Sequence, residues 1–309
     1  MTIPFISFDE MDNILNWSDV ADAMLAGHSL PKSSISDGLV YRKDDTLLSR
    51  SAWIDGLGAL VKAATIVPEN TAKGFPMVNG GVMLFDNETG QLEALVDFHL
   101  VTKWKTAADS LLGAKLLANP DSKDFLIVGA GTVSRNMVSA YASTFEDARF
   151  MVWNRNPDNA HKMVTDLSGS FNISQVDDLE AAVKRADVIT CATMTSDPVI
   201  KGAWLQAGQH LNLIGAYRPD MREADDLALQ RARIFVDSRE TTVNHIGELM
   251  LPIASGVISE NDVVADYYDI ATGAFSNTDN AEITLFKNGG GAHLDLMTAK
   301  LILQKWREA

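Results

Sequence analysis

The segment FLIVGAGTVSRNM, residues 125–137, constrains the fold more than any other part of the sequence. A short apolar run ends in Gly-Ala-Gly, and a segment whose apolar residues have helical spacing begins directly afterwards. Glycines at such a place allow the chain to turn sharply between a strand and a helix. We therefore expect a buried strand, a tight turn and a helix here.

The alternation continues from residue 125 to residue 290, where short apolar runs are separated by amphipathic stretches. Continuous apolar runs of this length are typical of parallel strands that are covered on both faces. The pattern predicts an α/β fold with a doubly wound parallel sheet. The predicted strands are 125–130, 150–153, 187–193, 210–216 and 233–237, and the predicted helices are 133–145, 157–168 and 177–185.

The chain before this region has a different pattern. Two β-rich runs flank Asn87-Glu88-Thr89-Gly90, which indicates a hairpin and an antiparallel sheet. Helices are expected at 104–118 and 292–306, and the second should pack back on the N-terminal part. We predict two domains with a cleft between them: an α+β domain of residues 1–118 and 290–309, and a doubly wound domain of residues 119–289.

Bulk properties exclude several partners. The net charge of −15 argues against nucleic acid, because phosphate neutralisation needs clustered lysine and arginine. No apolar run approaches the ~18 residues of a membrane span, and the N-terminus lacks the basic and apolar regions of a secretory signal. A single cysteine, Cys191, excludes an internal disulfide. We expect a cytoplasmic protein.

Metal and hydrolase chemistry find little support in the sequence. The only histidine pair with ligand spacing, His245-x-x-Glu248, does not make a metal site alone, so no metal is expected. The nucleophile motif G-x-S-x-G is absent from the sequence.

The glycine turn fits a dinucleotide. Gly129 allows the tight turn and Gly131 allows close approach of the backbone to a pyrophosphate. The N–H groups at the start of the following helix, those of Thr132 and Val133, would then bind the phosphate oxygens. The context of strand, turn and helix makes a Rossmann-type sheet the best interpretation; a purely structural turn is the alternative.

The end of the second strand bears on which dinucleotide is bound. An NAD site usually has an acidic residue there for the ribose 2′-hydroxyl. This sequence has Trp153-Asn154-Arg155-Asn156, without an acid and with a guanidinium that would attract a 2′-phosphate. We favour NADP(H), with Asn154 and Arg155 around the ribose, and keep NAD(H) as the alternative; Arg155 as a solvated loop residue is the other interpretation.

Several cations in the first domain are candidates for binding an anion. Lys62 lies inside the apolar run ALVKAATIV, where a buried lysine needs a partner. A lysine that points to water from an edge strand is the simpler alternative. Lys105 lies near the start of a predicted helix, where a cation opposes the helix dipole, so a bound anion would favour it there. Arg50 and Arg42 are further candidates.

The whole set of motifs resembles the ornithine cyclodeaminase/mu-crystallin family. The resemblance rests on VKAATIVPEN, the GFP of 74–76, KTAADS, Pro120-Asp121-Ser122, IVGAGTVS, VWNR, RADVITCAT, LIGAYRPDMRE and FKNGGGAHLDL. These occur in order over almost the whole chain.

The resemblance implies a homodimer whose first domain forms the subunit contact, a Rossmann domain that binds NAD(H) or NADP(H), and a small amino or imino acid as substrate. By motif position, Lys62 matches the active-site lysine, and Lys105 stands at the place of an arginine that binds the substrate carboxylate. Arg50, with Arg42 in reserve, is chosen as the upstream carboxylate-binding arginine. The expected cofactor contacts are Thr106, Ala192, Thr193, Asn288 and Gly289.

One departure from the family's pattern affects the expected reaction. Cyclodeaminases of the family carry an aspartate where this sequence has Tyr217, and Asp220 is three residues further on. Without that carboxylate, the side-chain amine of ornithine loses its counter-ion. We therefore predict an NAD(P)H-dependent imine reductase, most specifically of Δ1-pyrroline-2-carboxylate to L-proline and also of Δ1-piperidine-2-carboxylate to L-pipecolate.

Three alternatives stay open at this point. The first is a reductase of an acyclic imine, such as iminosuccinate or the imine of pyruvate in an alanine dehydrogenase reaction. The second is ornithine cyclodeaminase itself, a lyase that uses NAD catalytically. The third is an NADPH-dependent binding protein of the mu-crystallin type.

Overall fold

The computed structural model describes residues 3–309, which form two compact units. The first unit comprises the described residues up to Thr106 together with Gly290–Ala309, and the second comprises Ala107–Gly289. Residues 1–2, at the start of the predicted α+β domain, lie outside the described part. No helix within residues 3–309 is long and apolar enough to cross a membrane.

The second unit is built on a sheet of eight strands in the order β13-β12-β14-β11-β10-β7-β8-β9. All neighbouring pairs are parallel, which confirms the predicted doubly wound sheet. The five predicted strands are present, and β9, β13 and β14 were not predicted. The bounds are β7 Asp124–Val128, β8 Arg149–Trp153, β9 Ile173–Gln175, β10 Val188–Cys191, β11 His210–Leu213, β12 Ala232–Val236, β13 Val263–Ala265 and β14 Ile283–Lys287.

Helices connect these strands, and the strand order reverses between β7 and β10. In open α/β sheets, ligands bind beyond the carboxyl ends of the strands at such a reversal. The three predicted helices of this region are confirmed. The helices are α4 Thr132–Ala142, α5 Pro157–Leu167, α6 Leu179–Arg185, α7 Asp226–Arg231, α8 Arg239–Thr242 and α9 Gly247–Ala254, with short 3-10 turns at Gly202–Trp204, Glu260–Asp262 and Tyr267–Thr272.

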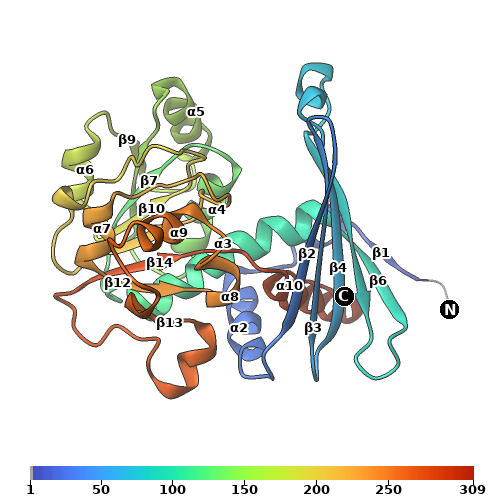
Figure 1. Ribbon diagram of the computed structural model, residues 1–309. Helices are drawn as coiled ribbons and strands as arrows, with labels where there is room; N and C mark the ends of the chain where they lie inside the picture. Colours follow the sequence, from blue (N-terminus) through green and yellow to red (C-terminus); the bar gives the residue numbers. More distant parts are fainter. Residues whose placement is uncertain (1–2) are drawn as a thin grey trace. The chain divides into compact units, whose positions relative to one another are not determined.

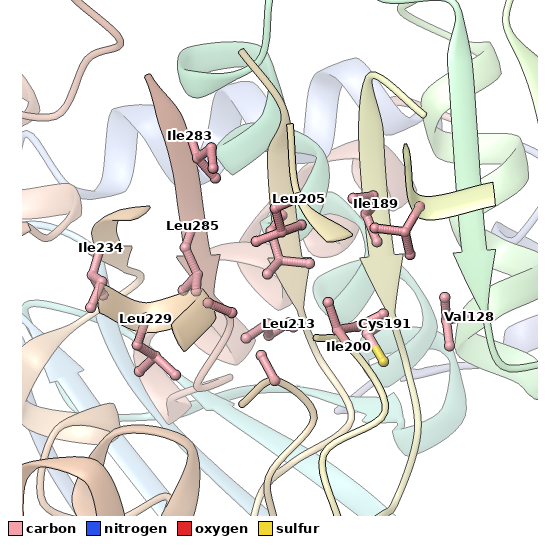
Figure 2. Packing of buried hydrophobic residues seen from close by; sticks show 14 of the residues in the cluster. Val128, Ile189, Cys191, Ile200, Leu205, Leu213, Leu229, Ile234, Ile283 and Leu285 are labelled. Atoms are coloured by element: carbon pink, nitrogen blue, oxygen red, sulfur yellow. The ribbon is translucent and has the colours of Figure 1, made fainter. Parts of the chain in front are cut away.

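Alternate residues of the central strands form the core on one face of this sheet. Figure 2 shows the side chains of Val128, Ile189, Leu213, Ile234 and Leu285 spread over neighbouring strands of this sheet, and all belong to one buried apolar cluster. All five are fully buried. This packing holds the strands in register, so that their carboxyl ends and the loops that follow have fixed positions.

The first unit contains a six-stranded sheet in the order β1-β6-β5-β4-β3-β2. Its pairs are antiparallel except for β1 with β6, and the predicted hairpin at 87–90 joins β5 to β6. The bounds are β1 Phe5–Ile6, β2 Ser34–Arg42, β3 Asp45–Ile54, β4 Gly58–Ile66, β5 Val78–Phe85 and β6 Leu92–Asp97.

Two helices cover one face of this antiparallel sheet (Figure 1). The C-terminal helix α10, Ala292–Glu308, packs on β3 and β4 and on α2, Trp17–Gly27, which confirms that the end of the chain returns to its N-terminal part. The remaining helices are α1 Phe8–Met11, the 3-10 turn Pro68–Lys73 and α3 Phe98–Leu117, which continues into the second unit.

Candidate active site

Three of the predicted cations lie together in the first unit. Arg50 on β3 and Lys62 on β4 are register partners, so their side chains leave the sheet on the same face, the one that α10 covers. Lys105, in the third turn of α3, approaches the same place. Because α3 begins at Phe98, the prediction that Lys105 stands near the start of a helix is wrong. Lys62 and Lys105 are each only 5% exposed. Lys62 is therefore not the solvated edge lysine that the sequence left open.

One buried carboxylate, that of Asp295, lies among these cations. The Nζ of Lys62 donates to Asp295 Oδ1 at 2.8 Å and to Thr102 Oγ1 at 2.7 Å. The Nζ of Lys105 is 3.7 Å from the same Oδ1. Asp295 belongs to the first turn of α10, where the N-terminal helix dipole favours a negative charge.

The backbone just before α10 receives the two other cations. The carbonyl oxygen of Gly290 accepts hydrogen bonds of 2.9 Å from Lys105 Nζ and from Arg50. Arg50 also forms a bidentate pair with Asp37, at 2.7 Å for the shorter contact. Three cations thus face two carboxylates, and of these only Asp295 is buried. The arrangement suits a further small anion.

Burial and charge shift the pKa values of this group. Burial, together with the charges of Lys105 and Arg50, lowers the pKa of Lys62 to about 8, against the opposing effect of Asp295. Burial raises the pKa of Asp295, but the charges of Lys105, Lys62 and Arg50 outweigh it, so the net pKa lies below the ordinary value. A lysine that titrates near 8 can both hold and release a proton near neutral pH.

The structure places two other sequence candidates apart from these contacts. Arg42 lies at the turn between β2 and β3, where its exposed guanidinium pairs with Asp45 at 2.8 Å. Thr106 follows Lys105 on α3 and is partly buried. At the position of the family's aspartate, Tyr217 is 58% exposed, and the carboxylate of Asp220 pairs with Arg218 at 2.7 Å.

The glycine turn of the second unit has the geometry that a phosphate needs. Gly129 has a φ of +114°, and a Cβ there would lie 2.8 Å from the carbonyl oxygen of Ala192. A Cβ on Gly131 would meet no atom within 4 Å, so its space is open to a ligand. Gly131 is the N-cap of α4, which starts with Thr132 and Val133 and has no acidic residue in its first turn. The N–H groups of this turn are directed at that space.

A cavity of about 380 Å³ follows this turn along the carboxyl ends of β7, β8 and β10. It brings together most of the predicted cofactor residues. Its lining includes Gly129, Gly131, Asn154, Arg155, Ala192 and Thr193. No carboxylate lines it among the described residues, and Arg155 is exposed at its edge. The group fits a dinucleotide with an anionic backbone.

Asn288 and Gly289 follow β14 at the same edge of the sheet. The side chain of Asn288 is buried and donates to Ser110 Oγ at 3.0 Å. A Cβ on Gly289 would lie 2.4 Å from Thr242, so the backbone is closely packed there. The carboxylate of Glu223 accepts hydrogen bonds from the N–H of Thr193 at 2.7 Å and from its hydroxyl at 3.0 Å.

Asp295 and Glu223 are the charged residues that the motif analysis missed. An aspartate in the first turn of a helix is an ordinary capping residue, and Glu223 stands among other acids in the segment PDMREADD. The only local signal was that Lys62 needed a buried partner.

Comparison with known proteins identifies the family of this chain. Residues 54–309 match the ornithine cyclodeaminase/mu-crystallin family. A relative from Paracoccus denitrificans (strain Pd 1222), named Δ1-pyrroline-2-carboxylate reductase, is 50% identical over 301 residues. The alignment covers 96% of this chain and 95% of the relative.

Two solved structures extend the likeness to the fold. Thermococcus litoralis Δ1-pyrroline-2-carboxylate reductase in complex with NADH and L-proline matches with a TM-score of 0.88 and 29% identity, over 99% of this chain and 98% of that one. An archaeal alanine dehydrogenase dimer with bound NAD matches with a TM-score of 0.91 and 26% identity, over 100% and 97%. The chain belongs to the ornithine cyclodeaminase/mu-crystallin family.

Proposed function

We propose that this chain is an NAD(P)H-dependent reductase of a small cyclic imino acid, which converts Δ1-pyrroline-2-carboxylate to L-proline and Δ1-piperidine-2-carboxylate to L-pipecolate. The observation that carries the proposal is the group of the buried Lys62 and Lys105 and the partly buried Arg50 around the buried carboxylate of Asp295. The 50% identity to the Paracoccus denitrificans reductase, over nearly the full length of both chains, supports the choice of substrate.

Arg50 and Lys105 bind the substrate carboxylate in this proposal. Both already donate to one acceptor, the carbonyl oxygen of Gly290, so their donor groups converge within a small volume. Two charge-assisted hydrogen bonds to a carboxylate fix its position and its plane. A ring that carries the carboxylate next to C=N is thereby oriented, which is the main entropic contribution to a two-reactant step.

Lys62 supplies the proton in this proposal. Its ammonium has three N–H groups, and within residues 3–309 two of them are directed at Thr102 and Asp295. The third is available to the imine nitrogen. As a hydride reaches the imine carbon, the nitrogen takes the proton from Lys62, and the C=N double bond becomes CH–NH. Asp295 keeps Lys62 protonated before the step.

The second unit holds the dinucleotide in this proposal. A bound reduced nicotinamide supplies the hydride, which is the chemistry of the cofactor itself. The open space at Gly131 and the first turn of α4 would take the pyrophosphate. Asn154 and Arg155 would lie around the adenosine ribose, and Ala192, Thr193, Asn288 and Gly289 would complete the part of the site that the second unit supplies. Thr106, which belongs to the first unit, stays a contact expected from the sequence.

We propose NADP(H) as the preferred cofactor. The cavity at Asn154 and Arg155 has no carboxylate in its lining among the described residues. A 2′-phosphate would meet no repulsion there and would gain the guanidinium of Arg155. The Thermococcus litoralis relative holds NADH in its structure, so the choice between NADH and NADPH has to be measured for this chain itself.

The geometry favours imine reduction over cyclodeamination. An ornithine side-chain ammonium needs a carboxylate, but the residue at the family's aspartate position is the exposed Tyr217. The carboxylate of Asp220 forms an ion pair with Arg218.

Purified protein supplied with NADPH and Δ1-pyrroline-2-carboxylate should therefore oxidise the cofactor, whereas ornithine should release no ammonia. NADPH oxidation only with ammonia plus pyruvate or oxaloacetate would indicate that the substrate is an acyclic imine. If none of these compounds leads to NADPH oxidation, the result would indicate a binding protein.

We propose that the chain forms a homodimer through the outer face of the antiparallel sheet. Apolar side chains are exposed on that face, on the opposite side from Lys62: Phe5, Val40, Leu47, Trp53 and Leu95. An apolar area of this extent on a folded unit is typical of a contact surface. The archaeal alanine dehydrogenase relative is a dimer.

Lys62→Ala should lower kcat for the imine roughly 100-fold or more, because it removes the proton donor. The measurement is the rate of NADPH oxidation, followed by its absorbance. The matched control is Lys300→Ala, a lysine of the same unit that pairs with Glu93, and its rate should stay within about twofold of wild type. A Lys62→Ala rate near wild type would remove this residue from the mechanism.

The reductive rate should fall as pH rises through about 8, the pKa to which burial lowers Lys62, because only the protonated amine donates. Asp295 raises that pKa, so Asp295→Asn should move the fall to lower pH. The full pH profile of kcat is the readout. Asp19→Asn, which removes a surface partner of Lys305, is the control and should leave the profile in place. An unmoved profile in Asp295→Asn would contradict the assignment.

Arg155→Asp should reverse or weaken the preference for NADPH. A charge-assisted hydrogen bond contributes about 1.5–3 kcal/mol, so the ratio of kcat/KM for NADPH to that for NADH should fall roughly 10-fold or more. Lys162→Asp makes the same change of charge on α5, outside the cavity lining, and should leave the ratio unchanged. An equal ratio in wild type and Arg155→Asp would show that another residue recognises the ribose.

Trp53→Glu should convert the dimer to a monomer, because it places a charge in the middle of the proposed apolar contact. Sedimentation velocity at micromolar concentration measures the change in mass. Leu227→Glu, at an exposed leucine of the second unit, should remain dimeric. A dimeric Trp53→Glu protein would move the subunit contact to another surface.

A further inference from the structure

A second buried charged group lies in the second unit, and the proposed chemistry does not use it. It consists of Glu223, Glu248 and Lys287, each of which is 0% exposed. The carboxylate of Glu223 accepts from the N–H and hydroxyl of Thr193 through Oε1, at 2.7 and 3.0 Å. Its Oε2 accepts from the N–H groups of Gly215 and Ala216, at 2.6 and 3.2 Å. One side chain thus joins the loops after β10 and β11.

Glu248 and Lys287 bind the backbone on either side of this carboxylate. The carboxylate of Glu248, in the first turn of α9, accepts from the backbone N–H of Glu223 at 2.7 Å and of Ala224 at 3.0 Å. Lys287, the last residue of β14, donates to the carbonyl oxygens of Leu213 at 3.0 Å and Asn288 at 2.8 Å. The group therefore connects the ends of β10, β11 and β14.

The charges of the three residues depend on one another. Burial raises the pKa of Glu223, and Lys287 lowers it. Burial, together with the charge of Glu223, raises the pKa of Glu248 to about 7. Burial lowers the pKa of Lys287, and the two glutamates raise it. Buried charges of this kind seldom stabilise a fold more than apolar side chains would, so a role in positioning the loops is a better explanation than stability.

The loops leave no space for a compensating shift. A Cβ on Gly215 would lie 2.1 Å from the carbonyl oxygen of Thr193, so the two backbones are in direct contact. A change in the acceptor at Glu223 therefore acts directly on Thr193, whose N–H and hydroxyl both donate to that carboxylate.

We infer that Glu223, supported by Glu248 and Lys287, is a positioning residue that fixes the loops which receive the nicotinamide half of the dinucleotide. The inference rests on the proposed function, which places Thr193 and Asn288 along that half. The hydrogen bonds of the group do not involve Gly131, Asn154 or Arg155. The adenosine half should therefore bind independently of Glu223.

Glu223→Gln is the variant that separates the two halves. A glutamine keeps the length of the side chain but turns one acceptor oxygen into a donor. Either the N–H and hydroxyl of Thr193 or the N–H groups of Gly215 and Ala216 then lose their acceptor. We expect kcat to fall roughly 10- to 100-fold, as for a small misplacement of reacting groups. The dissociation constant of 2′,5′-ADP, a probe for the adenosine half, should stay within about twofold, while that of NADPH should rise and the fluorescence of its bound nicotinamide should change.

Asp187→Asn is the matched control. Asp187 accepts from the backbone N–H groups of Lys123 and Asp124 at the opposite, amino-terminal end of the strands. The Asp187→Asn variant should be somewhat less stable than wild type, and the fluorescence of its bound NADPH should be unchanged. If Glu223→Gln does not fold, Glu248→Gln should give the same pattern with a smaller loss of kcat, because it releases the backbone of Glu223 and leaves its carboxylate.

The outcomes distinguish this inference from the proposed function. If the wild type binds NADPH, and Glu223→Gln shows the same kcat and nicotinamide fluorescence, then the positioning role is wrong and the proposed function stands. Equal losses of affinity for 2′,5′-ADP and NADPH would also overturn it, because they would indicate a general structural defect. A wild type that binds neither NADPH nor NADH would end the proposed function itself.

Discussion

A lysine inside a sheet stays charged only while a carboxylate and other acceptors replace the water around it. Lys62 meets that condition through Asp295 and Thr102. The condition ties β4 to the first turn of α10, which follows the whole second unit in the sequence. Without α10, the positive charges of Lys62, Lys105 and Arg50 would have no buried carboxylate among them. The C-terminal helix therefore both packs on the sheet and supplies the carboxylate that compensates these positive charges.

Local patterns account for much of what the sequence predicts correctly. The glycine turn at Gly129, five parallel strands, the hairpin at 87–90 and the final helix each have a signal within a short window. The missed strands β9 and β13 have only three residues each, which is too few for a periodic pattern. Sequence reasoning also selects Arg50, Lys62 and Lys105 as cations in need of an anion, and the structure places the three around two neighbouring acceptors, Asp295 and the carbonyl oxygen of Gly290.

Partners distant in sequence account for what the residues alone could not reveal. Lys62 and Asp295 are separated by 233 positions, and neither neighbourhood contains a sign of the other. Glu223 follows the same logic: it lies 30 positions after Thr193, and it looks like one more surface acid in an acidic segment. Nothing in the pattern of charged residues indicates that its carboxylate faces inward, because that depends on how Gly215 and Thr193 meet.

The two units use buried charge in opposite ways. In the first, cations outnumber carboxylates, and ammonium donors remain for a ligand. In the second, the carboxylates of Glu223 and Glu248 outnumber the single cation Lys287, and backbone N–H groups within the protein fill their acceptor oxygens. A carboxylate whose oxygens already accept backbone hydrogen bonds has few acceptor positions for a ligand, but it restrains each segment that donates to it. On the proposed function, a changed charge in the first unit should therefore alter what the protein binds, whereas a changed charge in the second should alter where a bound molecule lies.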